Sequence, residues 1–121
     1  MSTVPSVSFR EMTLADHRAV IDLMQRTPGV SIRDADSPEA IARFLNRNPG
    51  LSFIAESEGR LVGCLMGGHD GRRGTLYHLA VDADWRRQGI ASVLVDRCLA
   101  ELARQGIHKT HIDVFRSNED G

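Results

Sequence analysis

The most constraining feature of this 121-residue chain is an apolar run that leads, through a short basic turn, into a long helical pattern. The run covers residues 76–81 and is too apolar to leave one face in water, so it predicts a buried strand. From Gly89 to Gln105 apolar residues recur at helical spacing, and Gly106 is typical of a helix C-terminus. A buried strand followed directly by such a helix predicts a mixed α/β chain.

The remaining patterns predict four further strands and two shorter helices. The order β-α-α-β-β-β-α-β indicates an antiparallel meander that ends in a β-α-β crossover, within one domain spanning residues 1–121. We expect strands at residues 7–10, 51–55, 61–66 and 107–115, helices that begin at Thr13 and Ser37, and an eight-residue turn at 67–74.

Composition excludes several classes of function. Fifteen Lys and Arg against sixteen Asp and Glu argue against a nucleic-acid or membrane-surface binder. No apolar run reaches the ~18 residues of a membrane span, and the first residues do not resemble a signal peptide, so we expect a cytoplasmic protein. Cys64 and Cys98 lie in apolar runs without ligand spacing, which predicts core residues and no metal site.

Residues 82–92 carry the chemistry that the sequence suggests. A helix N-terminus presents unpaired N–H groups and positive dipole charge, and Gly89 permits close approach of a ligand to the main chain. Arg86 and Arg87 add attraction for anions, so the segment predicts a diphosphate site. It is neither a Walker loop nor a dinucleotide fingerprint. The same features also occur in α/β proteins that bind nothing at this position, so the residues alone leave both interpretations open.

The pattern Arg86-x-x-Gly89-x-Ala91 resembles the Arg/Gln-x-x-Gly-x-Gly/Ala motif of the GNAT acyltransferases. The preceding strand resembles the one that leads into that motif, and residues 47–53 and 68–81 are similar to a bacterial subgroup of the family. The resemblance extends over residues 7–118. It implies a GNAT-like α+β fold and an N-acetyltransferase that moves the acetyl group of acetyl-CoA to a primary amine.

The resemblance also implies a set of coenzyme A contacts. Main-chain groups of the strand would pair with the pantetheine arm as if it were an extra strand, and N–H groups of the helix start would hold the pyrophosphate. The residues so assigned are Leu79, Ala80, Val81, Arg86, Arg87, Gln88, Gly89, Ile90, Ala91, Ser92 and Asn118.

Direct attack by an amine on the thioester needs a group that accepts the amine proton. Tyr77 and His78 lie on the strand beside the expected thioester and are our candidates. Glu56, His111 and Asp113 on neighbouring strands stay open as alternatives. A cysteine acyl-enzyme is disfavoured, because neither cysteine has an adjacent base in the sequence.

Members of the family usually continue with a helix, which often bears a tyrosine that acts as the general acid, and with two more strands. This sequence ends at Gly121. We therefore expect a C-terminally short member and a homodimer that contacts through residues 107–115, which would otherwise form an open edge. A coenzyme A-binding core without catalysis, or a fragment of a longer acetyltransferase, is the main alternative; a small interaction domain without a ligand is a lesser one. The acceptor, a small-molecule or peptide amine, is not indicated further.

Overall fold

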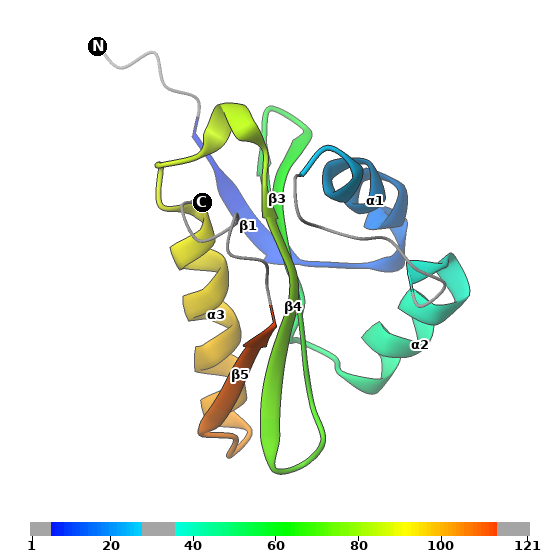
Figure 1. Ribbon diagram of the computed structural model, residues 1–121, viewed down its shortest axis with the longest axis vertical. Coiled ribbons are helices and arrows are strands. Elements are labelled where there is room, and N and C mark those ends of the chain that lie inside the picture. The colour runs from blue at the N-terminus through cyan, green and yellow to red at the C-terminus, as the bar shows by residue number, and fades with distance from the viewer. Residues whose placement is uncertain (1–5, 28–35, 114–121) are drawn as a thin grey trace.

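The computed structural model describes residues 6–27 and 36–113, without the side chains of Ile112 and Asp113. A five-stranded sheet in the order β1-β2-β3-β4-β5 carries α3 on one face and α1 and α2 on the other (Figure 1). The strands are β1 (Ser8–Glu11), β2 (Phe53–Ser57), β3 (Arg60–His69), β4 (Arg73–Val81) and β5 (Lys109–Asp113), and the helices are α1 (His17–Gln25), α2 (Pro38–Arg47) and α3 (Ile90–Arg104), with 3-10 turns η1 (Leu14–Asp16) and η3 (Ala83–Trp85).

The connectivity confirms the predicted mixed fold. Strands β1 to β4 pair antiparallel with their neighbours, and β5 pairs parallel to β4 after the crossover through α3. The strand predicted to be buried, β4, lies between β3 and β5. No helix among the described residues is both long and apolar enough to span a bilayer.

The helix ends follow the capping residues of the sequence. The N–H of Thr13 donates to the Asp16 carboxylate at 2.9 Å before α1, and the Ser37 hydroxyl accepts from the Ala40 N–H at 3.2 Å at the start of α2. Gly106, with a φ of 90°, ends α3 in the left-handed conformation that glycine favours. Local chemistry therefore fixes where these helices begin and end.

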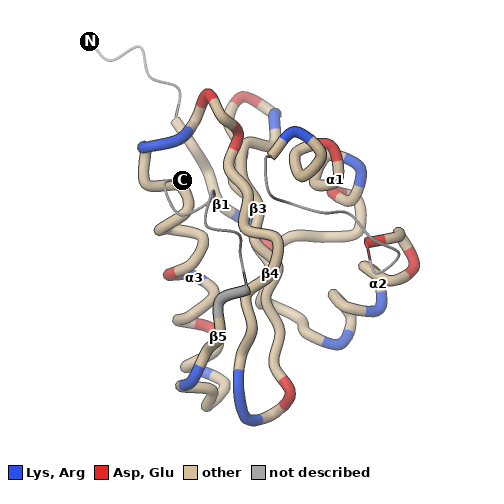
Figure 2. Tube along the Cα trace, in the orientation of Figure 1, with Lys and Arg blue, Asp and Glu red and all other residues tan. Residues whose placement is uncertain are grey.

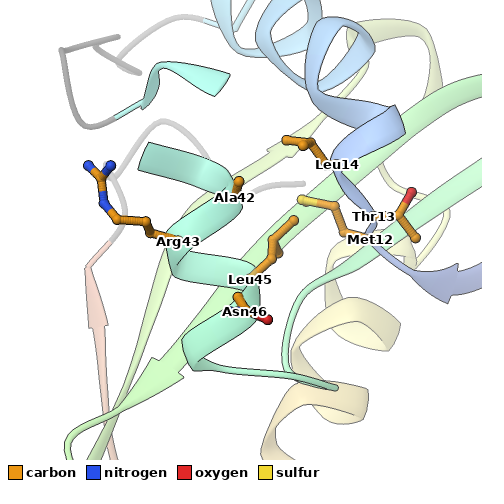
Figure 3. Close-up of a pocket in the computed structure, with 7 residues that line it drawn as sticks. All are labelled: Met12, Thr13, Leu14, Ala42, Arg43, Leu45 and Asn46. Atoms are coloured by element: carbon orange, nitrogen blue, oxygen red, sulfur yellow. The ribbon is translucent and has the colours of Figure 1, made fainter. Parts of the chain in front are cut away.

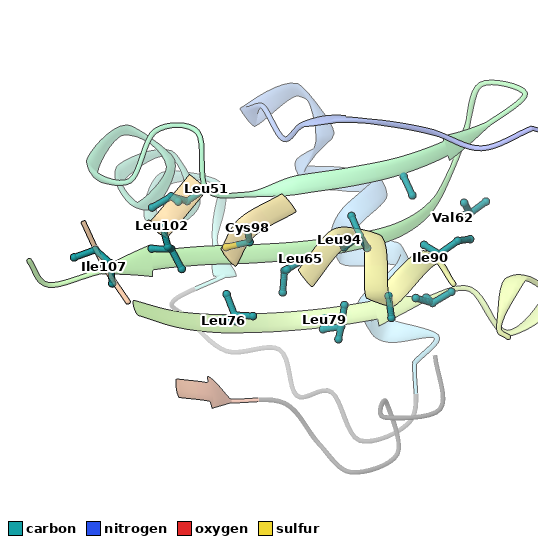
Figure 4. Packing of buried hydrophobic residues seen from close by; sticks show 13 residues of the cluster. Leu51, Val62, Leu65, Leu76, Leu79, Ile90, Leu94, Cys98, Leu102 and Ile107 are labelled. Atoms are coloured by element: carbon teal, nitrogen blue, oxygen red, sulfur yellow. The ribbon is translucent and has the colours of Figure 1, made fainter. Parts of the chain in front are cut away.

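Each face of the sheet packs its own apolar cluster. On the α3 face, Leu94, Cys98 and Leu102 of the helix pack against Leu65 and Leu76 of the sheet (Figure 4). The opposite face packs a second cluster against α1 and α2, with Leu23, Met24, Ile41, Ile54 and Cys64 among its buried members. Both cysteines are buried in these clusters, as predicted, and burial raises the pKa of each thiol to about 12.

The turn predicted over residues 67–74 is present but shorter than predicted. Strand β3 continues to His69 and β4 begins at Arg73, so only three residues separate the strands. Gly71 lies in the turn with a φ of 94°, but Gly67, Gly68 and Gly74 are packing residues instead. A Cβ at Gly67 would collide with the Cys98 sulfur and lie 2.6 Å from the Leu51 carbonyl oxygen, and one at Gly74 would lie 2.9 Å from Leu102. They let α3 and the segment before β2 approach the sheet closely.

Other strand boundaries also differ from the prediction, and the strand expected at residues 51–55 covers Phe53–Ser57. The first strand covers Ser8–Glu11, one residue later than expected. The last covers Lys109–Asp113, and Ile107 lies before it as a buried member of the α3-face cluster. Residues 114 and 115, which were predicted to complete this strand, lie outside the described residues.

Candidate active site

A β-bulge in β4 places two consecutive side chains on the same face of the sheet. The pairing of β3 with β4 shifts between Cys64↔Ala80 and Met66↔Tyr77, which leaves one extra residue on β4. His78 occupies this bulge with a φ of 51°. Side chains of a regular strand alternate between faces, but the two residues of a bulge point to the same side. Tyr77 and His78 accordingly both line a cavity beneath α2.

His78 is held by a carboxylate from the start of α2. Its Nε2 lies 2.8 Å from Oδ1 of Asp36, whose side chain is only 5% exposed. The main-chain carbonyl of Asp36 lies 2.8 Å from Nε2 of His17, which ties the same residue to α1. A carboxylate oxygen accepts hydrogen bonds, so Nε2 of His78 is the donor of this pair, and in the neutral imidazole the lone pair is on Nδ1. This arrangement presents an imidazole that is able to accept a proton.

Two cavities meet at the Tyr77 ring. The smaller, about 180 Å³, is lined by Asp36, Met66 and His78 together with Phe44 and Tyr77. The larger, about 470 Å³, shares Phe44 and Tyr77 and extends along β4 toward the β3–β4 turn. The two rings meet edge to face with centroids 5.7 Å apart. Both rings line both cavities, so they lie where a small compartment at His78 adjoins a longer one.

A third cavity, about 540 Å³, lies between η1 and α2 and is shown in Figure 3. Met12, Leu14 and Leu45 line it, and Arg43 is its one ionisable lining residue among those described. It contains neither Tyr77 nor His78. An arginine does not exchange a proton near neutral pH, so this cavity holds no group for acid–base chemistry.

On the α3 side, the turn between β4 and α3 is an open surface with left-handed backbone. Arg87 and Gly89 have φ values of 64° and 78°, and Gly89 is the N-cap of α3. Among the described residues, a Cβ built at Gly89 meets nothing within 4 Å, so the main chain there is open to close approach. In the described part of the chain, Arg86 and Arg87 form no ion pair. Their charges and the unpaired N–H groups of α3 are thus available to an anion.

The buried carboxylate of Asp82 anchors this turn. It accepts from the main-chain N–H of Asp84 at 3.0 Å and from the guanidinium groups of Arg26 at 2.8 Å and Arg60 at 3.1 Å. Burial alone would raise the pKa of Asp82, but the hydrogen bonds from Arg26 and the Asp84 N–H outweigh it and hold the pKa below its usual value. The turn is therefore fixed at its β4 end by an ionised residue.

The residues assigned to coenzyme A divide into two groups. The side chains of Leu79, Val81, Ile90 and Ala91 belong to the α3-face cluster and Ala80 belongs to the opposite one, so these side chains are part of the core and would not contact a ligand. Strand β5 pairs with β4 only up to Tyr77↔Asp113, and the main chain of residues 79–81 has no strand partner on that side among the described residues. The second group, Arg86, Arg87, Gln88, Gly89 and Ser92, lies at least partly exposed around the start of α3, whereas Asn118 lies outside the described residues.

A family model described as the acetyltransferase (GNAT) family matches residues 17–120. The chain belongs to this GNAT family. Its enzyme class is therefore that of the acyl-CoA-dependent acetyltransferases. An acetyltransferase of Pectobacterium atrosepticum is 41% identical over 105 residues, which cover 86% of this chain and 73% of that protein. One of Yersinia enterocolitica is 40% identical over 89 residues, 73% of this chain and 63% of that protein.

Solved structures of GNAT enzymes share the fold. The diaminobutyrate acetyltransferase of Paenibacillus lautus, in complex with L-2,4-diaminobutyric acid and coenzyme A, superposes with a TM-score of 0.79 at 23% identity, over 95% of this chain and 69% of that one. The PaiA N-acetyltransferase of Thermoplasma acidophilum, in complex with coenzyme A, gives 0.78 at 17% identity, over 94% and 82%. An aminoglycoside acetyltransferase from a soil metagenome, in complex with sisomicin, gives 0.71 at 22% identity, over 93% and 80%.

The alternative bases fare differently in this GNAT fold. Glu56 is paired with Arg10, with Oε1 3.0 Å from Nε, and lies outside both β4 cavities. His111 lines the larger cavity but not the compartment that holds His78. The side chain of Asp113 lies outside the described residues. Neither Asp36 nor Asp82 was predicted to act as a catalytic or positioning residue. The adjacent helix cap at Ser37 was a signal that Asp36 is held in place.

Proposed function

We propose that the chain transfers the acetyl group of acetyl-CoA to a primary amine by direct attack of the amine on the thioester. The observation that carries this proposal is the β4 bulge. It brings Tyr77 and His78 to the α2 face immediately before residues 79–81. Among the described residues, the main chain of this segment has no strand partner toward β5. Donor and acceptor would therefore meet at one point of β4.

On the donor side, we propose that the pantetheine arm pairs with the main chain of residues 79–81 and that the pyrophosphate sits over Gly89. The left-handed conformation and open space at Gly89 support close approach by an anion, as do the two unpaired guanidinium groups beside it. The buried side chains of Leu79 and Ile90 would form the apolar floor below the cofactor without contacting its phosphates.

On the acceptor side, His78 would act as the base. The amine nitrogen forms a bond to the thioester carbonyl carbon while Nδ1 of His78 accepts the amine proton. The C–S bond then breaks, and the thiolate leaves with its electron pair and is protonated. Asp36 stabilises the imidazolium that forms and holds the ring orientation.

Tyr77 would supply the wall of the amine compartment and a phenol hydroxyl that donates a proton to the departing thiolate. Its ring is fixed by the edge contact with Phe44, so the hydroxyl position is set by packing. Removal of the hydroxyl alone, in Tyr77→Phe, keeps that wall and isolates the proton donation.

Association and location also remain proposals. Strand β5 is the outer strand of the described sheet order and pairs only with β4 in it, so we propose that a second copy packs against this edge to form a homodimer. We propose a cytoplasmic site of action, because acetyl-CoA is an intracellular metabolite.

The proposal is tested with purified protein, acetyl-CoA and a panel of primary amines, with free thiol and acetylated product measured separately. We expect the release of free thiol to depend on the amine, and the amount of thiol to equal the amount of acetylated product. Coenzyme A at one hundred times its dissociation constant should also stabilise the fold by about 2.7 kcal/mol. Thermal stabilisation without turnover of any amine would indicate a binding module instead. Absence of both would contradict the assignment of the cofactor site.

A further inference from the structure

The larger cavity on the α2 face carries information about the acceptor. Its volume is about 470 Å³, and it begins at the Tyr77 and Phe44 rings that bound the His78 compartment. From there it follows Thr75 and Arg73, which lie on the same face of β4 as Tyr77 because side chains alternate along a strand. A molecule whose amine reaches His78 would extend along this cavity.

The far end of the cavity is rich in cations that lack a partner. Arg47 at the end of α2 and Arg73 at the start of β4 both line it, and neither forms an ion pair among the described residues. Lys109 of β5 lies directly opposite Arg73 in the parallel pairing, also unpaired there. Like charges at opposed strand positions destabilise a sheet. An anion bound between them would relieve that repulsion. Basic residues of the α2 end, the β3–β4 turn and the start of β5 lie in the lower half of Figure 2.

The other polar lining residues neutralise only part of this positive charge. Asp70 is the one acidic lining residue. It accepts from the main-chain N–H groups of Arg73 and Arg72, and these bonds hold the pKa of Asp70 below its usual value. His69 accepts from the Gly71 N–H through Nδ1, and its Nε2 lies 3.0 Å from the Gln105 side-chain oxygen. The cavity lining therefore carries two guanidinium groups and one carboxylate, and this carboxylate is already hydrogen-bonded within the β3–β4 turn.

The spacing along β4 sets the size of the acceptor. Tyr77 and Arg73 are four residues apart, which is about 13 Å along a strand. A guanidinium that reaches back along the cavity shortens this to roughly 10 Å, and three extended residues span about 10 Å. The cavity therefore fits a short chain with an amine at one end and an anion at the other.

We infer that the acceptor is a primary amine joined, over roughly 10 Å, to a carboxylate, and that Arg47 and Arg73 bind the carboxylate. The inference rests on the proposed acetyl transfer and narrows its substrate class. Free amino acids with a long side chain and short peptides with a free C-terminus share this chemistry. Polycations without a carboxylate do not, because the unpaired guanidinium groups repel them.

The experiment compares each acid with its amide, which differ only in the negative charge. L-lysine is set against L-lysinamide, and triglycine against triglycinamide, with spermidine as the polycation. We expect kcat/KM to be at least tenfold higher for the acid in one of the two pairs, and that pair identifies the source as amino acid or peptide. Equal values in both pairs, or spermidine as the best substrate, would overturn the inference while leaving acetyl transfer intact.

Matched arginine variants test the assigned residues. Arg47→Gln and Arg73→Gln should each lower kcat/KM for the preferred acid about tenfold and leave the amide unchanged, as the loss of one charge-assisted hydrogen bond requires. The controls are Arg43→Gln, one turn earlier on α2, and Arg72→Gln, the neighbour in the β3–β4 turn; neither residue lines this cavity. Equal losses in the variants and controls would contradict a specific carboxylate site.

Binding separates this inference from the proposed function. With the enzyme saturated by coenzyme A, titration calorimetry compares the same acids and amides without any turnover. If the enzyme binds an acid more tightly than its amide, and Arg73→Gln loses this preference, the carboxylate site is supported. This holds even if no amine is acetylated, and then only the proposed function fails. No preference for either acid in this titration overturns the inference.

Discussion

The two faces of β4 are built in different ways. Toward α3 the strand is closed, because Leu76, Leu79 and Val81 are buried against the helix. Toward α2 it is open, and Tyr77 and His78 line cavities with ionisable neighbours. In the proposed function, the first face binds coenzyme A through its pantetheine arm and its phosphates. The second suits an acceptor recognised through side chains.

The bulge at His78 is what lets one strand serve both faces. Without the extra residue, His78 would lie on the α3 face beside the core. With it, the alternation resets, so Leu79 returns to the α3 side while Tyr77 and His78 stay together on the other. The difference between the faces is therefore set by a single backbone irregularity, and substitutions on each face should have separable effects.

The largest effect is expected where the closed face leaves no space. Gly67→Ala would place a methyl group against the Cys98 sulfur and 2.6 Å from the Leu51 carbonyl oxygen, which cannot rotate away. We expect the free energy of unfolding to fall by about 3 kcal/mol in urea titrations. Gly63→Ala is the control on the same strand. Its nearest new contact is the Ile90 methyl at 2.9 Å, a side chain that is able to move, so a loss as large as that of Gly67→Ala would contradict this account.

On the open face, His78→Gln should remove the base and leave the fold and the cofactor site in place. We expect kcat to fall about 100-fold or more, which corresponds to about 2.7 kcal/mol, with the affinity for acetyl-CoA unchanged. His17→Gln is the control, since His17 contacts the Asp36 carbonyl but lines neither β4 cavity. Retention of most activity in His78→Gln would exclude this residue as the base.

Asp82→Asn tests the anchor between the two faces. Loss of the charged bonds to Arg26 and Arg60 should lower the free energy of unfolding by about 2 kcal/mol at pH 7. The pKa of Asp82 is lowered in the folded state, so its ionised form stabilises the fold above the ordinary carboxyl range. That contribution is lost as pH falls through the folded pKa. The difference between wild type and variant should therefore shrink below about pH 4; a difference that grows on acidification would reverse the assigned sign.

How well the sequence predicts each face depends on how close together in the chain the residues of that face lie. The turn at residues 82–92, the start of α3 at Gly89 and its end at Gly106 are contiguous in the chain, and their capping chemistry is readable without tertiary information. The order of strands and the crossover were predicted for the same reason. The resemblance to the family then indicated coenzyme A as a ligand for this turn, because the residues alone left open whether it binds one.

The open face and the Asp82 anchor are assembled from residues far apart in the chain. Asp36 and His78 are separated by 42 positions, and Arg26 and Asp82 by 56, so no local pattern links them. The glycines of residues 67–74 misled the prediction because a flexible turn and a close helix–sheet contact require the same residue. Only the packed structure distinguishes the two uses.

The central claim, that the start of α3 holds the coenzyme A phosphates, is tested most directly by a matched pair of glycines. Gly89 and Gly59 have φ values of 78° and 77°, and a Cβ at either meets nothing within 4 Å. Gly89→Val and Gly59→Val therefore impose the same backbone strain, one at the start of α3 and one in the β2–β3 hairpin. Calorimetric titration with acetyl-CoA should show at least a tenfold loss of affinity, about 1.4 kcal/mol, for Gly89→Val only. Equal affinities in the two folded variants would place the phosphates elsewhere and contradict the account.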